Sequence, residues 1–188
     1  MNTQKPELEI KNTVFLFTDG AYSNKRGIGG WGYVAVWNKR QLTGWGGTRG
    51  EQQEDTTTNN RMEFMAMLRG LERVPVSRLP IVLVSDSQYC LNSLFKWGEN
   101  WRRNGWRTAL GQPVKNVDLI RVLMEELLCR GQEKQPVHAR WVKGHAGLYL
   151  NEMADTLATL GQAETGAGVE DLKEVPAAYI ESFNRVLV

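Results

Sequence analysis

The sequence has few of the residues and segments that would mark a metal cluster or a membrane protein. Only two of its 188 residues are cysteines, which cannot form a metal cluster on their own. No apolar run approaches the ~20 residues of a membrane-spanning helix, and the longest are short segments such as 14–17 and 81–84. Cys90 and Cys129 lie in apolar helical contexts, and both are expected to be buried free thiols.

The start of the chain also lacks the apolar core of a secretion signal. Residues 1–11 are largely polar or charged, which predicts a cytoplasmic protein. A hydrophobic share of 41% and a charged share of 23% are typical of a globular domain, and there is no internal repeat or low-complexity linker. We divide the chain into a short N-terminal extension at 1–12, one domain at 13–160 and a tail at 161–188 of unknown role.

The net charge of +2 is small, but the charges are segregated along the chain. Residues 96–107 hold four cations and one anion, whereas the tail holds five acids and two bases. Three tryptophans lie among the cations, a composition that suits recognition of a nucleic-acid backbone. The alternative is a core helix whose cations reach outward. Asn100, Asn104 and Gly105 interrupt the helical pattern, which favours nucleic-acid binding.

The periodicity of apolar residues predicts strands first and then strands alternating with helices. Strands are expected near 13–18, 31–37, 41–48, 81–85 and 137–142. Helices are expected near 59–74, 88–97, 116–129 and 151–160. The order is therefore βββαβααβα, which indicates an α/β fold with a mixed sheet flanked by helices.

Four acidic residues are placed where they can meet at one edge of this sheet. Asp19 ends the first strand and Asp86 ends the fourth, while Glu63 and Asp155 lie on helices. Crowded carboxylates raise one another's pKa, and a hard cation such as Mg²⁺ or Mn²⁺ relieves the repulsion. For any single acid, the alternative is a helix cap or a solvated loop carboxylate.

A histidine lies in a glycine-flanked loop between the last strand and the last helix. His145 belongs to the segment 142–147, and its ring is expected to be exposed and mobile. Beside a metal-bound carboxylate cluster it could act as a general base or proton shuttle. Without such a cluster it is an ordinary surface residue. His138 alternates within a strand and is interpreted as structural.

Five motifs together resemble type 1 ribonuclease H in its bacterial form, over roughly residues 14–160. They are FTDG at 17–20, TTNNRME at 57–63, SDSQY at 85–89, WVKGHAG at 141–147 and NEMAD at 151–155. The resemblance implies a ribonuclease H-like fold with a five-stranded mixed sheet. It also implies an endonuclease that hydrolyses the RNA strand of RNA–DNA hybrids by two-metal-ion catalysis, leaving 5′-phosphate and 3′-hydroxyl ends.

The resemblance also implies roles for individual residues. The metal ligands would be Asp19, Glu63, Asp86 and Asp155, holding two Mg²⁺ ions with Mn²⁺ as a possible substitute, and His145 would be the mobile histidine. Asn59 and Gln88 would contact the RNA strand around its 2′-hydroxyls, and Thr58 would bind a DNA phosphate. A basic protrusion would grip the DNA strand through Trp97, Asn100, Trp101, Arg102, Arg103 and Trp106.

The sequence departs from the family pattern in three places. Residues 23–27 replace the usual turn after the first strand, and Asn24 is the candidate for its substrate contact. The loop 49–57 is long, and the tail 161–188 could pack on the body or bind a protein partner. We expect a monomer.

Two other functions would suit the same fold. A module that only binds hybrids would have no reason to keep four converging acids. A strand-transfer nuclease would share the metal site but lacks the motifs at 57–63 and 143–147.

Overall fold

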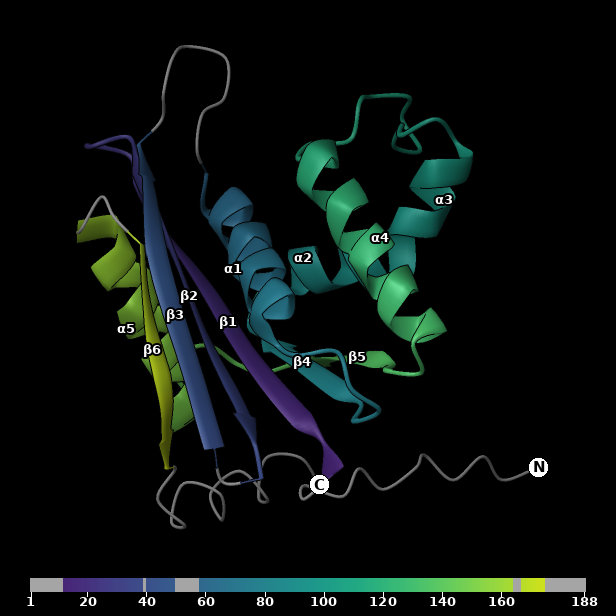
Figure 1. Cartoon of the computed structure of the whole chain (residues 1–188). Helices are drawn as coiled ribbons and strands as arrows, with labels where there is room; N and C mark the ends of the chain where they lie inside the picture. The colour runs from purple at the N-terminus through teal and green to yellow at the C-terminus, as the bar shows by residue number, and fades with distance from the viewer. Residues whose placement is uncertain (1–11, 39, 50–57, 164–166, 175–188) are drawn as a thin grey trace.

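The computed structural model shows a twisted sheet with helices on both of its faces (Figure 1). It describes residues 12–38, 40–49, 58–163 and 167–174. The expectations for most of the N-terminal extension, for the loop 50–57 and for the end of the tail therefore lie outside the described residues. No helix among the described residues is both long and apolar enough to cross a membrane.

The five expected strands are present and form one mixed sheet. They are β1 (Val14–Ser23), β2 (Ile28–Trp37), β3 (Arg40–Arg49), β4 (Ile81–Ser85) and β5 (Val137–Trp141). The first three form an antiparallel meander, whereas β4 runs parallel to β1 and β5 runs parallel to β4. The predicted ribonuclease H-like architecture is confirmed in its strand order and its mixture of directions.

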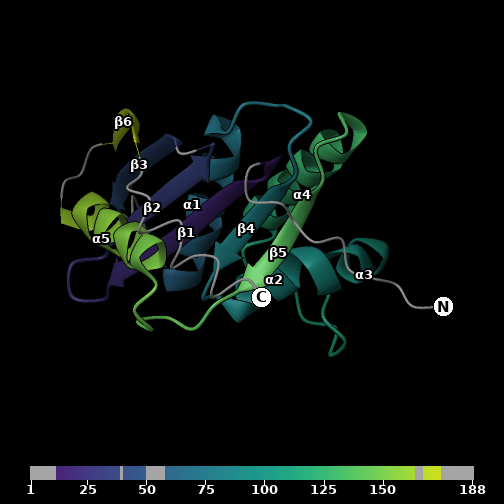
Figure 2. The same cartoon turned by 90° about the horizontal axis from the view of Figure 1, so that it is seen from below.

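The helices follow the predicted order with one addition, α3, between β4 and β5. They are α1 (Asn59–Arg73), α2 (Gln88–Asn92), α3 (Gly98–Arg103), α4 (Val117–Gln132) and α5 (Tyr149–Ala163). A single π-helical turn, η2 (Ser93–Trp97), joins α2 to α3. The two views show α5 on one face of the sheet and α1 to α4 on the other (Figures 1 and 2).

The described part of the sheet has six strands, one more than expected. The additional strand, β6 (Ala167–Glu174), pairs antiparallel with β3 and extends the edge of the sheet. It lies within residues 161–188, the predicted tail. Its composition, with Gly168 and four charged residues among eight, lacks the alternation of apolar and polar residues that predicts a strand.

Alternating side chains of the central strands build two hydrophobic layers. On β1, Leu16 joins the layer under α1, whereas Phe15 and Phe17 join the layer under α5. On β4, Leu83 and Val84 divide in the same way. Both faces of these strands are therefore buried, which explains why β1 and β4 read as continuous apolar runs rather than as alternating ones.

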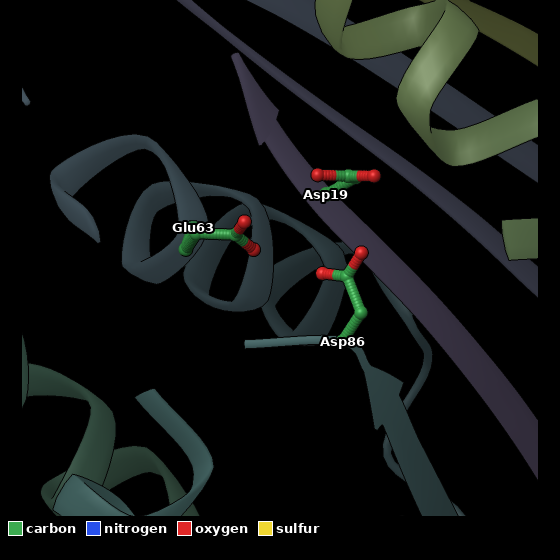
Figure 3. Close-up of side chains that lie close together, drawn as sticks. All are labelled: Asp19, Glu63 and Asp86. Carbon is green, nitrogen blue, oxygen red and sulfur yellow. The ribbon is translucent and has the colours of Figure 1, made fainter. Parts of the chain in front are cut away.

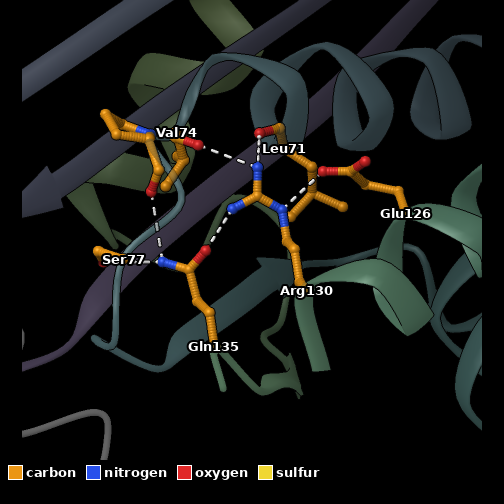
Figure 4. Close-up of polar contacts among 7 residues, drawn as sticks. Leu71, Val74, Ser77, Glu126, Arg130 and Gln135 are labelled. Carbon is orange, nitrogen blue, oxygen red and sulfur yellow. Dashed lines mark hydrogen bonds and ion pairs between the residues drawn. The ribbon is translucent and has the colours of Figure 1, made fainter. Parts of the chain in front are cut away.

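A buried arginine fixes the end of α1 against α4 (Figure 4). The guanidinium of Arg130 donates to the carbonyl oxygens of Leu71 and Val74, where α1 ends. It also donates to the side chains of Gln135 and Glu126. The side chain of Arg130 is only 3% exposed, so this network satisfies a buried charge together with the free carbonyls of a helix end.

The two cysteines are free thiols, but only one of them is buried. Cys90, on α2, lies in the core as expected, whereas Cys129 is exposed on α4. The expectation of burial for Cys129 is wrong, because it shares a face of α4 with the exposed Val122 and Glu125.

Candidate active site

Three carboxylates from three different elements meet beside the end of β4, next to the middle of β1 (Figure 3). Asp19 lies on β1, Glu63 lies on α1 and Asp86 directly follows β4. Each of them offers a carboxylate oxygen, and these three oxygens lie within 4.8 Å of one another. Three of the four predicted metal ligands are therefore brought together.

The pairing of β1 with β4 places two of these acids side by side. Phe17 pairs with Val84 in the parallel register, and each aspartate follows two residues later in its own segment. The third acid reaches them because α1 packs closely on β1 at Gly20. A Cβ atom at Gly20 would lie 2.3 Å from the backbone nitrogen of Glu63, so only glycine permits this approach.

Burial and like charge raise the pKa of all three acids. Burial, followed by the charges of Asp86 and Asp155, raises the pKa of Asp19 to about 7. The pKa of Glu63 is raised well above its usual range, again by burial first and then by the charges of Asp19 and Asp86. The pKa of Asp86 is raised mainly by burial. Without a cation, the site therefore retains protons near neutral pH.

The donor set fits a hard cation. Oε2 of Glu63 is buried and has no hydrogen-bond donor among the described residues. Oδ1 of Asp19 accepts a hydrogen bond of 2.7 Å from the backbone N–H of Gly20, which leaves its second oxygen available. Carboxylate oxygens without nitrogen or sulfur ligands are the donors that Mg²⁺ and Mn²⁺ prefer.

Asp155 and His145 form the outer part of the site. Asp155 does not belong to the group of three close carboxylates, but its charge raises the pKa of Asp19 and of Asp86. Oδ2 of Asp155 lies 3.9 Å from Nδ1 of His145, too far for a hydrogen bond. The ring of His145 is 81% exposed, as predicted, and its backbone has a left-handed φ of 50°.

The predicted substrate residues near the carboxylates lie on exposed turns and helix starts. Asn24 lies in the turn between β1 and β2. Thr58 caps α1 by accepting a hydrogen bond from the backbone N–H of Arg61, and Asn59 is the first residue of that helix. Gln88 begins α2, two residues after Asp86. All four predicted residues are exposed.

Residues 96–107, the basic segment, pack on the core through aromatic side chains and expose polar ones to solvent. Its aromatic rings pack in a series in which Trp97 lies against both Tyr89 and Trp101. Trp101 and Trp106 are half-buried against the core, and Trp97 is 39% exposed. The predicted polar contacts Asn100, Arg102 and Arg103 are exposed, and so are Lys96, Asn104 and Arg107 of the same segment.

Sequence reasoning missed two contacts that shape the site. Arg61 on α1 makes two hydrogen bonds to the carboxylate of Asp118 on α4, at 3.0 and 2.6 Å. The indole N–H of Trp141 donates to the backbone carbonyl oxygen of Asp86 at 2.9 Å. In each contact the two residues lie more than fifty positions apart in the sequence, so no local pattern links them. The position of Trp141 at the start of the WVKGHAG motif was the available signal for the second contact.

Comparison with known proteins gives consistent matches over most of the chain. A family model described as RNase H matches residues 11–163. The ribonuclease H of Hahella chejuensis is 43% identical over 152 residues, which cover 81% of this chain and 95% of that protein. The ribonuclease HI of Neisseria meningitidis serogroup A is 43% identical over 155 residues, which cover 82% of this chain and 99% of that protein.

A solved structure shares the fold at lower sequence identity. It is the crystal structure of a type 1 RNase H with a type 2 active-site motif. The TM-score is 0.69 at 24% identity, and the match covers 94% of this chain and 82% of the other.

Proposed function

This chain belongs to the RNase H family, and from that premise we propose that it hydrolyses the RNA strand of RNA–DNA hybrids. The observation that carries the proposal is the group formed by Asp19, Glu63 and Asp86. A module that only binds hybrids does not need three acids whose oxygens approach within 4.8 Å, because such a group repels phosphates. The reaction is endonucleolytic and leaves 5′-phosphate and 3′-hydroxyl ends.

The carboxylates would hold two Mg²⁺ ions, for which Mn²⁺ could substitute. Asp19, Glu63 and Asp86 supply the inner oxygens, and Asp155 contributes from the outer part of the site. When bound, the ions polarise the attacking water and stabilise the leaving 3′-oxygen. The chain itself contributes the fixed arrangement of the acids, which release their retained protons when a cation replaces them.

His145 moves a proton near this site. Its exposed ring lies beside Asp155, on a loop whose glycines Gly144 and Gly147 let the ring change position. The loose distance of 3.9 Å supports a transient role over that of a fixed ligand. Replacement by alanine should therefore leave measurable activity, reduced by about 10²- to 10⁴-fold.

The hybrid lies across the exposed residues that surround the carboxylates. Asn59 and Gln88 read the 2′-hydroxyls of the RNA strand, which separate RNA from DNA. Thr58 binds a phosphate of the DNA strand, and Asn24 makes a further contact. The DNA strand extends over the basic segment to Trp97, Asn100, Trp101, Arg102, Arg103 and Trp106.

The experiment is cleavage of a labelled RNA–DNA hybrid beside matched RNA–RNA and DNA–DNA duplexes. With Mg²⁺, only the RNA strand of the hybrid should be cut, and the products should carry 5′-phosphates. Asp86→Asn is the control that should abolish the cleavage. Hybrid binding without cleavage in Mg²⁺ or Mn²⁺ would instead support a binding module. Cleavage of the DNA–DNA duplex would support a strand-transfer nuclease.

The cytoplasmic location, the monomeric state and a protein partner for the segment 161–188 stay predictions. Sedimentation of the purified chain would test the monomeric state.

A further inference from the structure

The end of β5 and the connection that follows it touch one of the metal ligands at two points. The indole N–H of Trp141 donates to the backbone carbonyl oxygen of Asp86 at 2.9 Å. Three residues later, Gly144 lies against the carboxylate of the same aspartate. One segment therefore contacts both the main chain and the side chain of Asp86.

Burial alone does not account for a tryptophan at position 141. The residue is 47% exposed, although a large apolar ring usually lies inside the fold. Its backbone is already paired with Ser85 in the parallel register of β4 and β5. The indole N–H adds a bond one residue beyond that register, at the point where β4 has ended and the chain turns into α2.

Asp86 lies in a short turn that depends on such bonds. Its carbonyl oxygen also accepts a hydrogen bond of 3.1 Å from the backbone N–H of Gln88. The backbone N–H of Ser87 donates to the hydroxyl of Ser85 at 3.0 Å. The bond from Trp141 is the contact that ties this carbonyl to a different element, so it limits rotation of the turn relative to the sheet.

Gly144 sets the space available to the carboxylate. A Cβ atom at this position would lie 2.3 Å from Oδ2 of Asp86, closer than a real contact allows. The φ of Gly144 is not in the left-handed region, so the requirement for glycine arises from this approach and not from backbone conformation. Any side chain at 144 would force the carboxylate of Asp86 out of its position in the group of three acids.

We propose that Trp141 and Gly144 are positioning residues that hold Asp86 for metal binding, Trp141 through the main chain and Gly144 by leaving room for the carboxylate. The inference rests on the proposed metal site. Partners that orient metal ligands typically change metal affinity or activity by about 10- to 100-fold when they are removed.

The first test is Trp141→Phe, which keeps an aromatic ring and removes the N–H donor. We expect the concentration of Mg²⁺ that half-saturates the substrate-free protein to rise about 10-fold in an NMR titration. We also expect kcat to fall at subsaturating Mg²⁺ while KM for the hybrid is unchanged. The matched control is Trp37→Phe at the end of β2, which should leave both values as in the parent.

The second test uses Gly144→Ala and keeps the proposal testable if the tryptophan variant does not fold. The clash with Asp86 should also raise the half-saturating Mg²⁺ concentration by about 10-fold. Gly131→Ala is the matched control, because a Cβ atom there has no neighbour within 4 Å. That variant should bind Mg²⁺ as the parent does.

The outcomes separate this inference from the proposed function. If the parent binds no Mg²⁺, the proposed metal site itself is wrong. If the parent binds Mg²⁺ and both site variants bind it equally well, the positioning role is overturned. A rise in KM for the hybrid without a change in Mg²⁺ binding would overturn it too, because Trp141 would then contact the substrate. A lower Tm with unchanged Mg²⁺ binding would reduce Trp141 to a structural residue.

Discussion

At Asp19, the carboxylate that the chemistry requires also weakens the fold. The group is buried beside other acids, and its pKa of about 7 lies above the ordinary value of 3.8. The folded protein therefore holds a proton that the unfolded chain releases at lower pH. Stability from this group is fully present below about pH 4 and is lost as the pH rises through about 7. In the absence of a cation, ionised Asp19 is a destabilising residue at neutral pH and above.

Replacement of Asp19 by asparagine should separate these two effects. Asp19→Asn removes the charge at nearly constant volume, so cleavage of the hybrid should fall below detection while the fold is retained. In the absence of metal near pH 8, the free energy of unfolding should rise by ~1–3 kcal/mol, since a buried repulsion is removed. Hybrid affinity should be unchanged or tighter, because the site repels phosphates less. Chemical denaturation and an equilibrium binding assay measure these changes.

The control for this variant is the exposed carboxylate of Glu133, which follows α4. Glu133→Gln should leave activity and stability as in the parent. An Asp19→Asn variant that unfolds more easily and still cleaves the hybrid would show that the carboxylate is structural.

For single residues, the sequence predicts which side chains carry the chemistry better than it predicts the distances between them. Asp19 and Asp86 could be identified because a mixed sheet places their strands side by side, although β1 continues past Asp19 to Ser23 and only Asp86 follows its strand. The sequence could not reveal that Asp155 lies outside the close group, because its distance depends on how α5 packs on the sheet. The bond from Trp141 to Asp86 was equally hidden, since it joins residues that are distant in sequence.

Among the elements, α3 is a helix whose charges are partly neutralised. Glu99 forms ion pairs with Arg102 at 2.9 Å and with Arg103 at 3.1 Å. Both arginines are exposed, and hydrogen bonds from them lower the pKa of Glu99. In the free protein the two guanidinium groups are held on one side of the helix by an acid that phosphates could replace.

Changes in this helix should alter the salt dependence of hybrid binding in opposite directions. Replacement of Arg102 and Arg103 by alanine should raise KM, with a smaller effect on kcat. Each lost phosphate contact should flatten the slope of log K against log salt by about 0.7–0.9. Glu99→Gln frees both arginines and should steepen the slope. A binding titration over a range of salt concentrations measures this slope. Equal slopes in the parent and in both variants would show that the arginines lie on a solvated surface and contact no phosphate.

Arg130 connects two helices in a different way, because its charge is buried. Arg130→Met keeps most of the volume but leaves the carbonyls of Leu71 and Val74 without their donor. We expect a loss of about 3–5 kcal/mol in the free energy of unfolding, with kcat unchanged. Arg69→Met removes an exposed ion pair with Glu72 and should cost less than about 1 kcal/mol. Urea denaturation of both variants makes the comparison, and equal losses would contradict the role of Arg130.

The order of the elements could be predicted from periodicity because most of them bury a regular apolar face. Two structural features could not be predicted in this way. β6 has many charged residues and becomes a strand because the edge of β3 offers it hydrogen-bond partners. The apolar pattern predicts a continuous helix through 93–97, but the structure has a π-helical turn there. Trp97, at the end of this turn, packs on Tyr89 and Trp101, and these contacts between side chains are not visible in the sequence.

For the whole molecule, the acidic site links folding, protons and metal in one equilibrium. Asp19, Glu63 and Asp86 all have raised pKa values, so the folded state binds more protons than the unfolded state between about pH 4 and pH 7. The metal-free protein should therefore lose stability as the pH rises through this range. A cation that binds only the folded state opposes the loss, but it must displace the same protons.

This competition predicts that stabilisation by Mg²⁺ depends on pH. At about ten times its dissociation constant, Mg²⁺ adds about 1.4 kcal/mol to the free energy of unfolding, which for a chain of this size is roughly 3–5 °C in Tm. That shift should appear near pH 8, where the acids are largely ionised. At the same Mg²⁺ concentration near pH 5 the shift should almost vanish, because protons occupy the site.

Thermal melts with and without Mg²⁺ across this pH range provide the measurement. Asp19→Asn is the internal reference: without metal its Tm should fall less between pH 5 and pH 8 than that of the parent, and Mg²⁺ should raise it less at every pH. A Tm shift of equal size at pH 5 and pH 8 in the parent would mean that the cation binds elsewhere than at the protonated acids. In that case the raised pKa values of Asp19 and Glu63 would have no connection with metal binding.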